Sequence, residues 1–491
     1  MWLTESVTAA SDACELRGGR VGGRQMAHAG GTNAPRTGGG SAKPSMSVAL
    51  EVFRFRNYRY LWVSSLFSFT GMQMQQVARA LLAWRLTHSF GAVGAISLSF
   101  GLPMLLFSLV GGGLADRFEK RNLTLVSQLA TAVLALINAV MLVTGTITFE
   151  WLFILGLGGG TASALGMPAR SPMMAEVVGP NQVMSAMAMS NAAMNGTRLF
   201  GPAIAGAMVA AWNLESVYFL QAGLYVVSCL TLLAVPTGLS KLNASGATRK
   251  APGNMFKEIG AGLSYVWSDP RLRLLNGMMF IVSFFAMPYV MLLAGFVKRN
   301  LDGGDGAFGI LQSVSGVGAL VGSIGVAMLA GFERKAMLQW MAGTVGGLAL
   351  VGLALGSHAF GYAGAVAAIV VLGFALTAYQ TLNSTMLMDA SKPEYYGRVM
   401  SINMLSFSAM PLMAFPMGQL ADAIGARQTF TAQGLIVLAF MVFVAVSNPA
   451  RTFGRIPRRT WPTISVGRQE TALSATKADG DEAGAVAAGG S

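Results

Sequence analysis

The chain has 491 residues, of which 53% are hydrophobic and only 11% are charged, with a formal net charge of +13 at pH 7. Soluble domains carry charge on roughly a quarter of their positions, so this composition excludes an ordinary soluble protein and indicates lipid as the main surrounding. The positive charge does not indicate nucleic-acid binding, because no polar stretch is long enough to fold into a basic face with aromatic platforms.

Two polar tails flank the apolar body of the sequence. Residues 1–48 are rich in Gly, Ser, Thr and Arg and contain no apolar run long enough for a signal-peptide core, which predicts a disordered tail. Residues 448–491 begin with basic "RTFGRIPRR" and end in an Ala, Gly and acidic mixture, which predicts a second one. An alternative start at Met46, which opens "MSVALEVFRFRNYRYLW", would lead directly into the first apolar segment.

Apolar segments recur between the tails, each near or above the roughly 20 residues that a helix needs to cross a bilayer. They lack the alternation of polar and apolar residues that barrel strands require, so helices are predicted. The twelve predicted spans are 59–83, 92–115, 122–144, 150–169, 183–210, 216–236, 271–297, 307–331, 336–357, 361–388, 399–424 and 428–447. We therefore expect an all-α membrane protein.

The distribution of lysine and arginine predicts the orientation. If both tails are cytoplasmic, 28 of the 34 basic residues lie on the cytoplasmic side and four lie on the other side. This bias is the positive-inside pattern of membrane proteins. It predicts that both termini are cytoplasmic and that anionic lipids are the partners of these charges.

The stretch "GGGLADRFEKRN" at residues 111–122 places five charges together after the second predicted span. An aspartate at this position can face the positive end of a neighbouring helix, while arginines can anchor in the headgroup layer. The alternative is that these charges only determine the topology.

The two halves of the chain contain similar short sequences in the same order. "NYRYL" at residue 57 matches "DPRLR" at 269, "FEKR" at 118 matches "FERK" at 332, and "VMSAM" at 183 matches "VMSIN" at 399. The near-constant offset of the three matches predicts a duplicated six-helix unit. The predicted bundles are 49–236 and 271–447, joined by a cytoplasmic linker at 237–270 with a short amphipathic helix near "MFKEIGAGLSYVW". Many secondary transporters have this parallel-repeat plan, and their substrates bind near the midplane, between the repeats.

The charged loop, the twelve spans and the repeat together resemble the major facilitator superfamily over about residues 50–447. The residues that match its loop pattern are Gly112, Leu114, Ala115, Asp116, Arg117, Lys120 and Arg121, whereas Glu119 replaces the second glycine of that pattern. "RFRNYRYLW" and "MPARSPMMAEVV" are similar to the branch that contains the enterobactin exporter and macrolide-efflux-type proteins. The resemblance implies an inner gate formed by Gly112, Asp116, Arg117 and Arg121.

Polar residues within the spans predict a substrate cavity. The first span carries a stripe that includes Gln76 and Arg79, and lipid would not tolerate such a face. Because Arg79 is near the external end of the span, the alternative to ligand contact is that its side chain snorkels to the interface. Arg198 lies near the middle of the fifth span, where a charge costs about 2.5–3.5 kcal/mol and needs a partner. That partner is an anionic substrate group, an acid from another helix or, alternatively, backbone carbonyls. The predicted lining residues are Gln76, Arg79, Asn191, Asn195, Arg198, Tyr379, Gln380 and Asn383.

The fifth predicted span also contains Gly201 and Pro202, and a proline within a helix removes a hydrogen bond and bends the rod. The pair resembles the Gly-Pro motif of efflux members of the superfamily. It favours export over import.

Other functional classes fit less well. The histidines lie far from any acid cluster, so we expect neither an enzyme nor a metal site, and no cofactor is predicted. No Walker-type loop appears, and no recurrent pore motif supports a channel. The predicted function is proton-coupled export of a small amphipathic or anionic molecule by a monomer in the bacterial inner membrane, working by alternating access. The alternatives are an importer or facilitator of a small metabolite and a channel-like pore.

Overall fold

The computed structural model of the chain describes residues 51–179, 182–237, 255–329, 332–392, 395, 399–400, 402–403 and 410–447. Within these ranges, the side chains at 108–110, 112–113, 115–117, 184, 255–259, 261–262 and 305 lie outside the description. Both predicted tails and most of the predicted linker also fall outside it. The chain divides into two compact units, Met1–Ser45 and Met46–Ser491, and every described residue belongs to the second unit.

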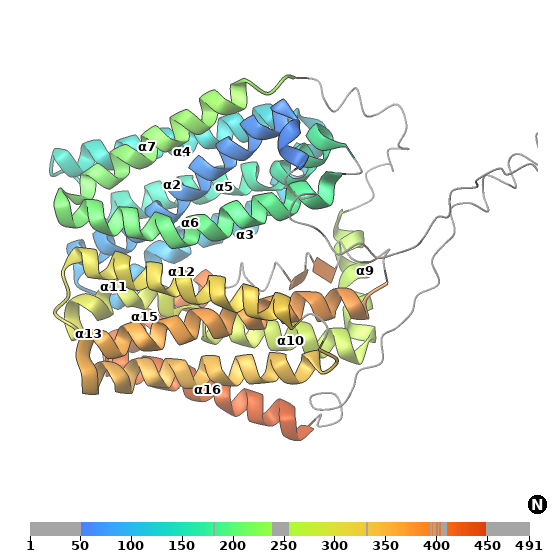
Figure 1. Cartoon of the computed structure of the whole chain (residues 1–491). Coiled ribbons are helices and arrows are strands. Elements are labelled where there is room, and N and C mark those ends of the chain that lie inside the picture. Colours follow the sequence, from blue (N-terminus) through green and yellow to red (C-terminus); the bar gives the residue numbers. More distant parts are fainter. Residues whose placement is uncertain are drawn as a thin grey trace, which may run out of the picture. The chain divides into compact units, whose positions relative to one another are not determined.

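The first half consists of helices joined by short turns (Figure 1). They are η1 (Glu51–Arg54), α2 (Arg56–Thr87), α3 (Phe90–Arg117), α4 (Lys120–Val143), α5 (Phe149–Val178), α6 (Val183–Ala211) and α7 (Leu214–Leu233). Each of the first six predicted spans corresponds to one of these helices. The main difference is α5, which continues past the predicted end at residue 169 to Val178, through Pro168 and Pro172.

The second half follows the same plan with more interruptions. Its helices are α9 (Met255–Ser268), α10 (Pro270–Phe285), α11 (Tyr289–Asn300), α12 (Asp305–Met328), α13 (Lys335–Ala390), α15 (Met410–Ile424) and α16 (Ala426–Ser447). The predicted span 271–297 is divided into α10 and α11, which begins after Pro288. The spans 336–357 and 361–388 meet within α13 at Gly361, whose φ of 57° and ψ of −133° break the helix. Part of the span 399–424 lies outside the described residues.

Eight helices of the described chain are long and apolar enough to cross a bilayer, as judged by length and composition. They are Phe90–Phe107, Lys120–Val143, Phe149–Val178, Leu214–Leu233, Pro270–Asn300, Gly306–Met328, Lys335–Ala390 and Ala426–Ser447. Helix α2 is not among them, since it carries a stripe of serines and glutamines that includes the buried Ser64, Ser68 and Gln75. A helix with such a stripe is stable in lipid only when other helices cover its polar face.

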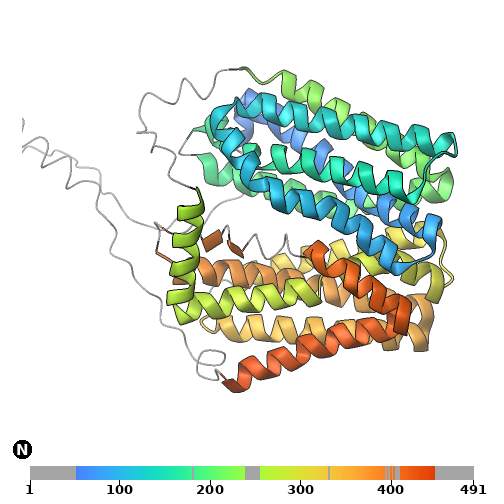
Figure 2. The same ribbon diagram turned by 180° about the vertical axis from the view of Figure 1, so that it is seen from behind.

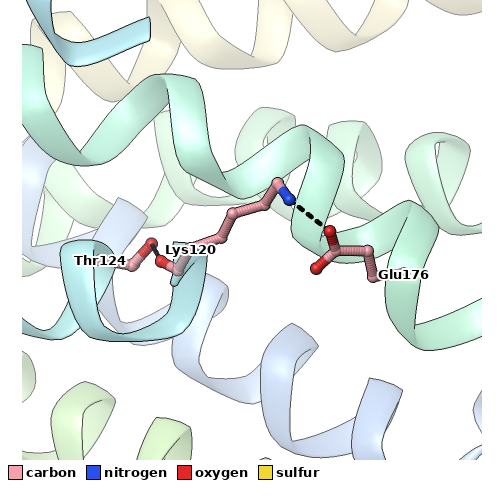
Figure 3. A network of polar contacts seen from close by, with 3 residues as sticks. All are labelled: Lys120, Thr124 and Glu176. Carbon is pink, nitrogen blue, oxygen red and sulfur yellow. Dashed lines mark hydrogen bonds and ion pairs between the residues drawn. The ribbon is translucent and has the colours of Figure 1, made fainter. Parts of the chain in front are cut away.

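Internal packing repeats between the halves. Helix α3 packs against α5 in the first half, as α12 packs against α13 in the second. An ion pair between Lys120 and Glu176 joins the start of α4 to the end of α5 (Figure 3). Its counterpart joins the two ends of α13, where Lys335 Nζ lies 2.8 Å from Asp389 Oδ2. Lys120 and Lys335 are 215 residues apart and Glu176 and Asp389 are 213 apart, so each ion pair lies within one residue of the place that the match of FEKR with FERK would give it.

Two helix pairs make most of the contacts between the halves, namely α3 with α15 and α6 with α12, and α11 also contacts α2 and α3. Three glycines of α3 and three of α12 make the close contacts of these two pairs, and they are spaced identically in the two helices. The corresponding residues are Gly91 and Gly306, Gly94 and Gly309, and Gly101 and Gly316. A Cβ atom on Gly94 would lie 2.3 Å from the carbonyl oxygen of Ala414, and one on Gly309 would lie 2.4 Å from the Cα atom of Gly206. We call these helix pairs the two seams; at Gly94 and Gly309 they pack backbone against backbone. The seams confirm two pseudo-symmetric bundles.

The seam of α3 with α15 also contains a carboxylate, that of Asp422. Its Oδ1 accepts a hydrogen bond from the backbone N–H of Phe90 at 2.8 Å, and its Oδ2 accepts from Gly91 N at 2.8 Å and Ser89 Oγ at 2.6 Å. A carboxylate at a helix N-terminus is stabilised by free N–H groups and by the helix dipole. At the corresponding place in the other seam, Gly306 meets the methyl group of Ala210.

Both seams run along the helix halves that adjoin the turns at 88–89, 212–213, 301–304 and 425. We call this the turn end of the molecule; it lies on the left in Figure 1, opposite the ends of the described chain. Figure 2 shows α15 and α3 side by side from behind, in agreement with their contacts. The two halves are thus held together at the turn end.

Candidate substrate cavity

A cavity of about 320 Å³ lies mainly inside the first half. Helices α2, α3, α4 and α5 supply most of its wall. The lining residues are Ser68, Phe69, Met72, Gln73, Gln76, Arg79, Ala80, Val93, Ile96, Ser97, Phe100, Gly101, Met104, Thr124, Ser127, Gln128, Thr131, Ser163, Gly166, Met167, Arg170, Tyr225, Met291, Met410 and Pro411. Only the last three come from the second half. Its size is at the lower end of the range for small-molecule sites.

The structure places two of the predicted cavity residues, Gln76 and Arg79, in this wall. The guanidinium carbon of Arg79 lies 4.2 Å from the centre of the Phe100 ring on α3. Its Nε and Nη1 atoms are buried and have no hydrogen-bond partner within the described chain. Phe100 therefore supports the cation, and the two N–H groups are left without a hydrogen bond.

Arg170 is a cavity residue that the sequence analysis misses. The predicted fourth span ends at residue 169, which would place this arginine among the cytoplasmic charges. Instead, α5 carries it inside the bundle, where its Nη2 donates to Ser68 Oγ at 2.6 Å and its guanidinium carbon lies 5.0 Å from the centre of the Phe69 ring. The signal that could have found it is the apolar Met173 and Met174 beyond Pro172, because membrane helices tolerate prolines.

The lining residues present hydrogen-bond donors in excess. Their buried side-chain atoms without a partner in the described chain are all nitrogens, namely Arg79 Nε, Arg79 Nη1, Gln128 Nε2 and Arg170 Nη1. Gln128 uses its oxygen to accept from Ser228 Oγ at 3.0 Å, so only its amino group is free. None of the described lining residues is acidic, and the ion pairs found in the described chain do not include either arginine.

The predicted residues on α6 lie elsewhere. Asn191, Asn195 and Arg198 are not among the described lining residues. The backbone of Arg198 forms part of the seam, since its carbonyl oxygen would lie 3.0 Å from a Cβ atom on Gly316. Their contact with a substrate stays a prediction.

The predicted residues on α13 pack within the second half. Tyr379 is fully buried in the hydrophobic core, and Asn383 Oδ1 accepts a hydrogen bond from Gln339 Nε2 at 2.9 Å. Gln380 donates to the sulfur of Met287 at 3.6 Å. In this conformation the three residues do not line the described cavity, so their lining role also stays a prediction.

The predicted gate is described only in part. Gly112, Asp116 and Arg117 belong to the end of α3, but their side chains lie outside the description. Arg121 donates from Nε to the carbonyl of Leu232 at 3.2 Å and from Nη2 to that of Leu233 at 2.8 Å. It thus caps the C-terminus of α7 within its own half, an arrangement that the helix dipole favours.

The predicted bend on α6 lies at the seam. The helix is continuous from Val183 to Ala211 through Gly201 and Pro202. A Cβ atom on Gly201 would lie 2.6 Å from the Cβ of Gln73, so this glycine allows α6 to approach α2 closely. Whether Pro202 bends the helix stays a prediction.

No group of three or more His, Cys, Asp or Glu residues among the described side chains is placed to hold a metal ion.

Two helical bundles related by an internal repeat, with a cavity that two arginines of the first half line, define a secondary transporter of the major facilitator type. The sequence model of the transmembrane secretion effector family matches residues 47–470, and the chain belongs to that family. This confirms the resemblance seen in the sequence. The protein is a membrane transporter and is not an enzyme.

Known relatives agree with this membership. The Staphyloferrin A transporter of Staphylococcus aureus is 22% identical over 79% of this chain and 96% of its own length. The Enterobactin exporter EntS of Shigella boydii is 25% identical over 60% of this chain and 69% of its own. Among solved structures, the nucleoside transporter NupG superposes with a TM-score of 0.62 at 14% identity, covering 81% of this chain and 99% of that one. This last likeness concerns the fold.

Proposed function

We propose that the protein is a proton-coupled exporter that moves a small amphipathic or anionic molecule across the bacterial inner membrane by alternating access. The observation that carries this proposal is the cavity lined by Arg79 and Arg170, among helices that the two seams join to the other half at the turn end. A cavity closed at one end by separable helix contacts is what alternating access requires.

The seams are suited to opening and closing. Each seam places glycines close to the backbone or to small side chains of the other half, so opening the turn end breaks these contacts together with that of Gly295 on α11 with Trp84 and Phe90. With both termini in the cytoplasm, as the positive-inside bias predicts, the turn end is external and this conformation faces inward. The protein would then load substrate from the cytoplasmic side.

Export is favoured by two observations. One named relative is an enterobactin exporter, and α6 carries the Gly201 and Pro202 pair that resembles the motif of efflux proteins. An importer of the same fold remains the alternative.

Proton coupling is proposed from the resemblance to the superfamily. Four acids at helix ends are the candidates for the proton carrier, namely Asp116, Glu176, Asp389 and Asp422. Glu176 and Asp389 bind lysines within their own halves, and the side chain of Asp116 lies outside the description. Asp422 is the described candidate whose contacts cross between the halves. Its protonation would weaken the cap on α3, because charged hydrogen bonds are stronger than neutral ones.

The test is accumulation of a compound panel in cells with and without the protein, each with and without a protonophore. We expect lower accumulation of at least one compound in the presence of the protein, and loss of that difference with the protonophore. Higher accumulation would instead identify an importer.

Vesicles reconstituted with the purified protein separate a carrier from a pore. A carrier saturates and shows counterflow, whereas flux that rises linearly with concentration without counterflow would favour the channel alternative.

A further inference from the structure

We propose that the cavity is a two-point anion site that takes a small molecule with two separated acidic groups, one at Arg79 and the other at Arg170. This inference rests on the proposed function, because it names the class of molecule that the exporter binds. It differs from the expectation from sequence, in which Arg198 is the anion contact.

The two positive charges of the cavity wall have no negative partner among the described lining residues. Arginine stays protonated in proteins, so the two side chains bring two positive charges into the bundle. None of the described lining residues supplies a negative charge. A buried cation without a counter-charge is strongly unfavourable, so an anion that enters the cavity gains at both positions.

The hydrogen-bonding pattern indicates the same ligand. The free buried atoms of the wall are N–H donors on Arg79, Arg170 and Gln128. An ionised carboxylate only accepts hydrogen bonds, so it complements side chains whose unpartnered atoms are donors. An amine or another cation would add donors and positive charge to a wall that already has an excess of both.

The two arginines lie at separate places in the cavity. Arg170 is bound to Ser68, which precedes Arg79 on α2 by three turns of helix, or about 16 Å along the helix axis. The guanidinium of Arg170 lies beside the ring of Phe69, and that of Arg79 lies beside the ring of Phe100. One small inorganic anion would satisfy a single arginine, whereas two acidic groups on one molecule satisfy both.

The apolar residues of the cavity wall indicate what the ligand should contain between its acidic groups. Phe69 and Phe100 lie beside the guanidinium groups, and Met72, Met104 and Met167 add adaptable apolar surface. The volume of about 320 Å³ corresponds to roughly ten water molecules. The molecule is therefore compact, with an apolar or flat centre between its acidic groups.

Isothermal titration of the purified full-length protein with two matched series tests the proposal. The first series is the linear dicarboxylates from succinate to suberate, and the second is the monocarboxylates of the same length, all at pH 7. We expect at least one dicarboxylate to bind about tenfold or more tightly than its monocarboxylate, because the second charged pair is lost in the latter. Equal affinities in the wild-type protein, or no binding of any dicarboxylate, would overturn the proposal without need of a variant.

Single variants test whether Arg79 and Arg170 each bind one acidic group of the ligand. Arg79→Gln and Arg170→Gln should each reduce the affinity of the best dicarboxylate to that of the monocarboxylate. The matched control is Arg427→Gln in the second half, where Nη2 donates to the carbonyl of Asn300 at 3.3 Å and the affinity should not change. If Arg198→Gln alone removes the preference for dicarboxylates, the assignment to Arg79 and Arg170 is wrong.

Counterflow in vesicles distinguishes this inference from the proposed function. If neutral or cationic compounds are exported equally by the wild type, Arg79→Gln and Arg170→Gln, the two-point site is wrong while the exporter stands. If no compound shows counterflow but dicarboxylates bind with the expected preference, the site stands and the proposed function fails.

Discussion

The two halves of this protein share a scaffold but differ in their interiors. The lysine–acid pairs and the glycine seams recur at corresponding positions of the two halves. Inside the first half, however, Arg79 and Arg170 line a cavity and have buried N–H groups without a partner in the described chain, whereas in the second half Gln339 and Asn383 bind each other. A duplicated fold thus keeps the contacts that hold helices in place, while the polar residues that face a ligand are free to diverge.

The seams show the same combination of symmetry and difference. Their glycines correspond one to one, yet the seam of α3 with α15 carries an acid, Asp422, where the other has Ala210. We therefore expect a glycine-to-alanine substitution to disturb both seams equally, whereas neutralising Asp422 should disturb only the seam of α3 with α15. The following predictions test this comparison, from the largest effect to the smallest.

Gly94→Ala and Gly309→Ala should each reduce transport by more than about tenfold, because overpacking costs about 1–3 kcal/mol or more. The new methyl groups would lie 2.3 Å from Ala414 O and 2.4 Å from Gly206 Cα. The measurement is counterflow in vesicles at matched protein content. Gly196→Ala on α6 is the control, since nothing lies within 4 Å of its Cβ position. If one seam tolerates the methyl group and the other does not, the seams are not equivalent.

Asn383→Leu should lower the free energy of unfolding by about 1–3 kcal/mol, because it leaves the buried Gln339 Nε2 without its acceptor. The apparent melting temperature in detergent measures this. The KM for an exported compound should not change, whereas Gln76→Ala in the cavity wall should raise it. A raised KM in both variants would show that the substrate reaches the second half, as the sequence predicts.

Asp422→Asn should shift the population towards the state with the turn end open, by about tenfold, since charged hydrogen bonds are roughly twice as strong as neutral ones. Spin labels at Leu86→Cys and Ile424→Cys, in a chain with Cys14→Ser and Cys229→Ser, would report a longer distance. Asp302→Asn is the control at the same end, with a positive φ of 49° that asparagine also adopts. An unchanged distance distribution would mean that the glycines alone hold the seam.

Lys120→Ala and Lys335→Ala should have the smallest effects. The pair of Lys120 with Glu176 is less exposed, at 17% and 20%, than that of Lys335 with Asp389, at 18% and 47%. We expect about 1 kcal/mol of destabilisation for the first and less for the second, because exposed ion pairs contribute little. Melting temperatures of the two variants and of the double variant measure the difference. A larger loss for Lys335→Ala would contradict this order.

Much of the fold could be predicted from the sequence because lipid imposes a simple constraint. Each span must be apolar and about 20 residues long, so the positions of the helices follow from hydropathy alone. The break at Gly361 and the division of the seventh span before Pro288 were less visible, since both depend on how neighbouring helices pack.

The site was harder to predict, as Arg79 and Arg170 show. Arg79 could be found because it belongs to a polar stripe on a span, which the helical period reveals. Arg170 was missed because two prolines suggest the end of a helix that in fact continues to Val178. Asn383 is expected in the cavity, yet it is bound to Gln339, a contact that joins two separate segments of α13.

The sequence by itself determined that this chain crosses a membrane repeatedly as a duplicated bundle and belongs among transporters, because hydrophobic length, charge bias and repetition are local or periodic properties. Only the tertiary structure decided which polar side chains meet and which remain free. That choice depends on contacts between distant helices, such as Arg170 with Ser68 and Asp422 with the start of α3, and no pattern along the chain encodes those distances.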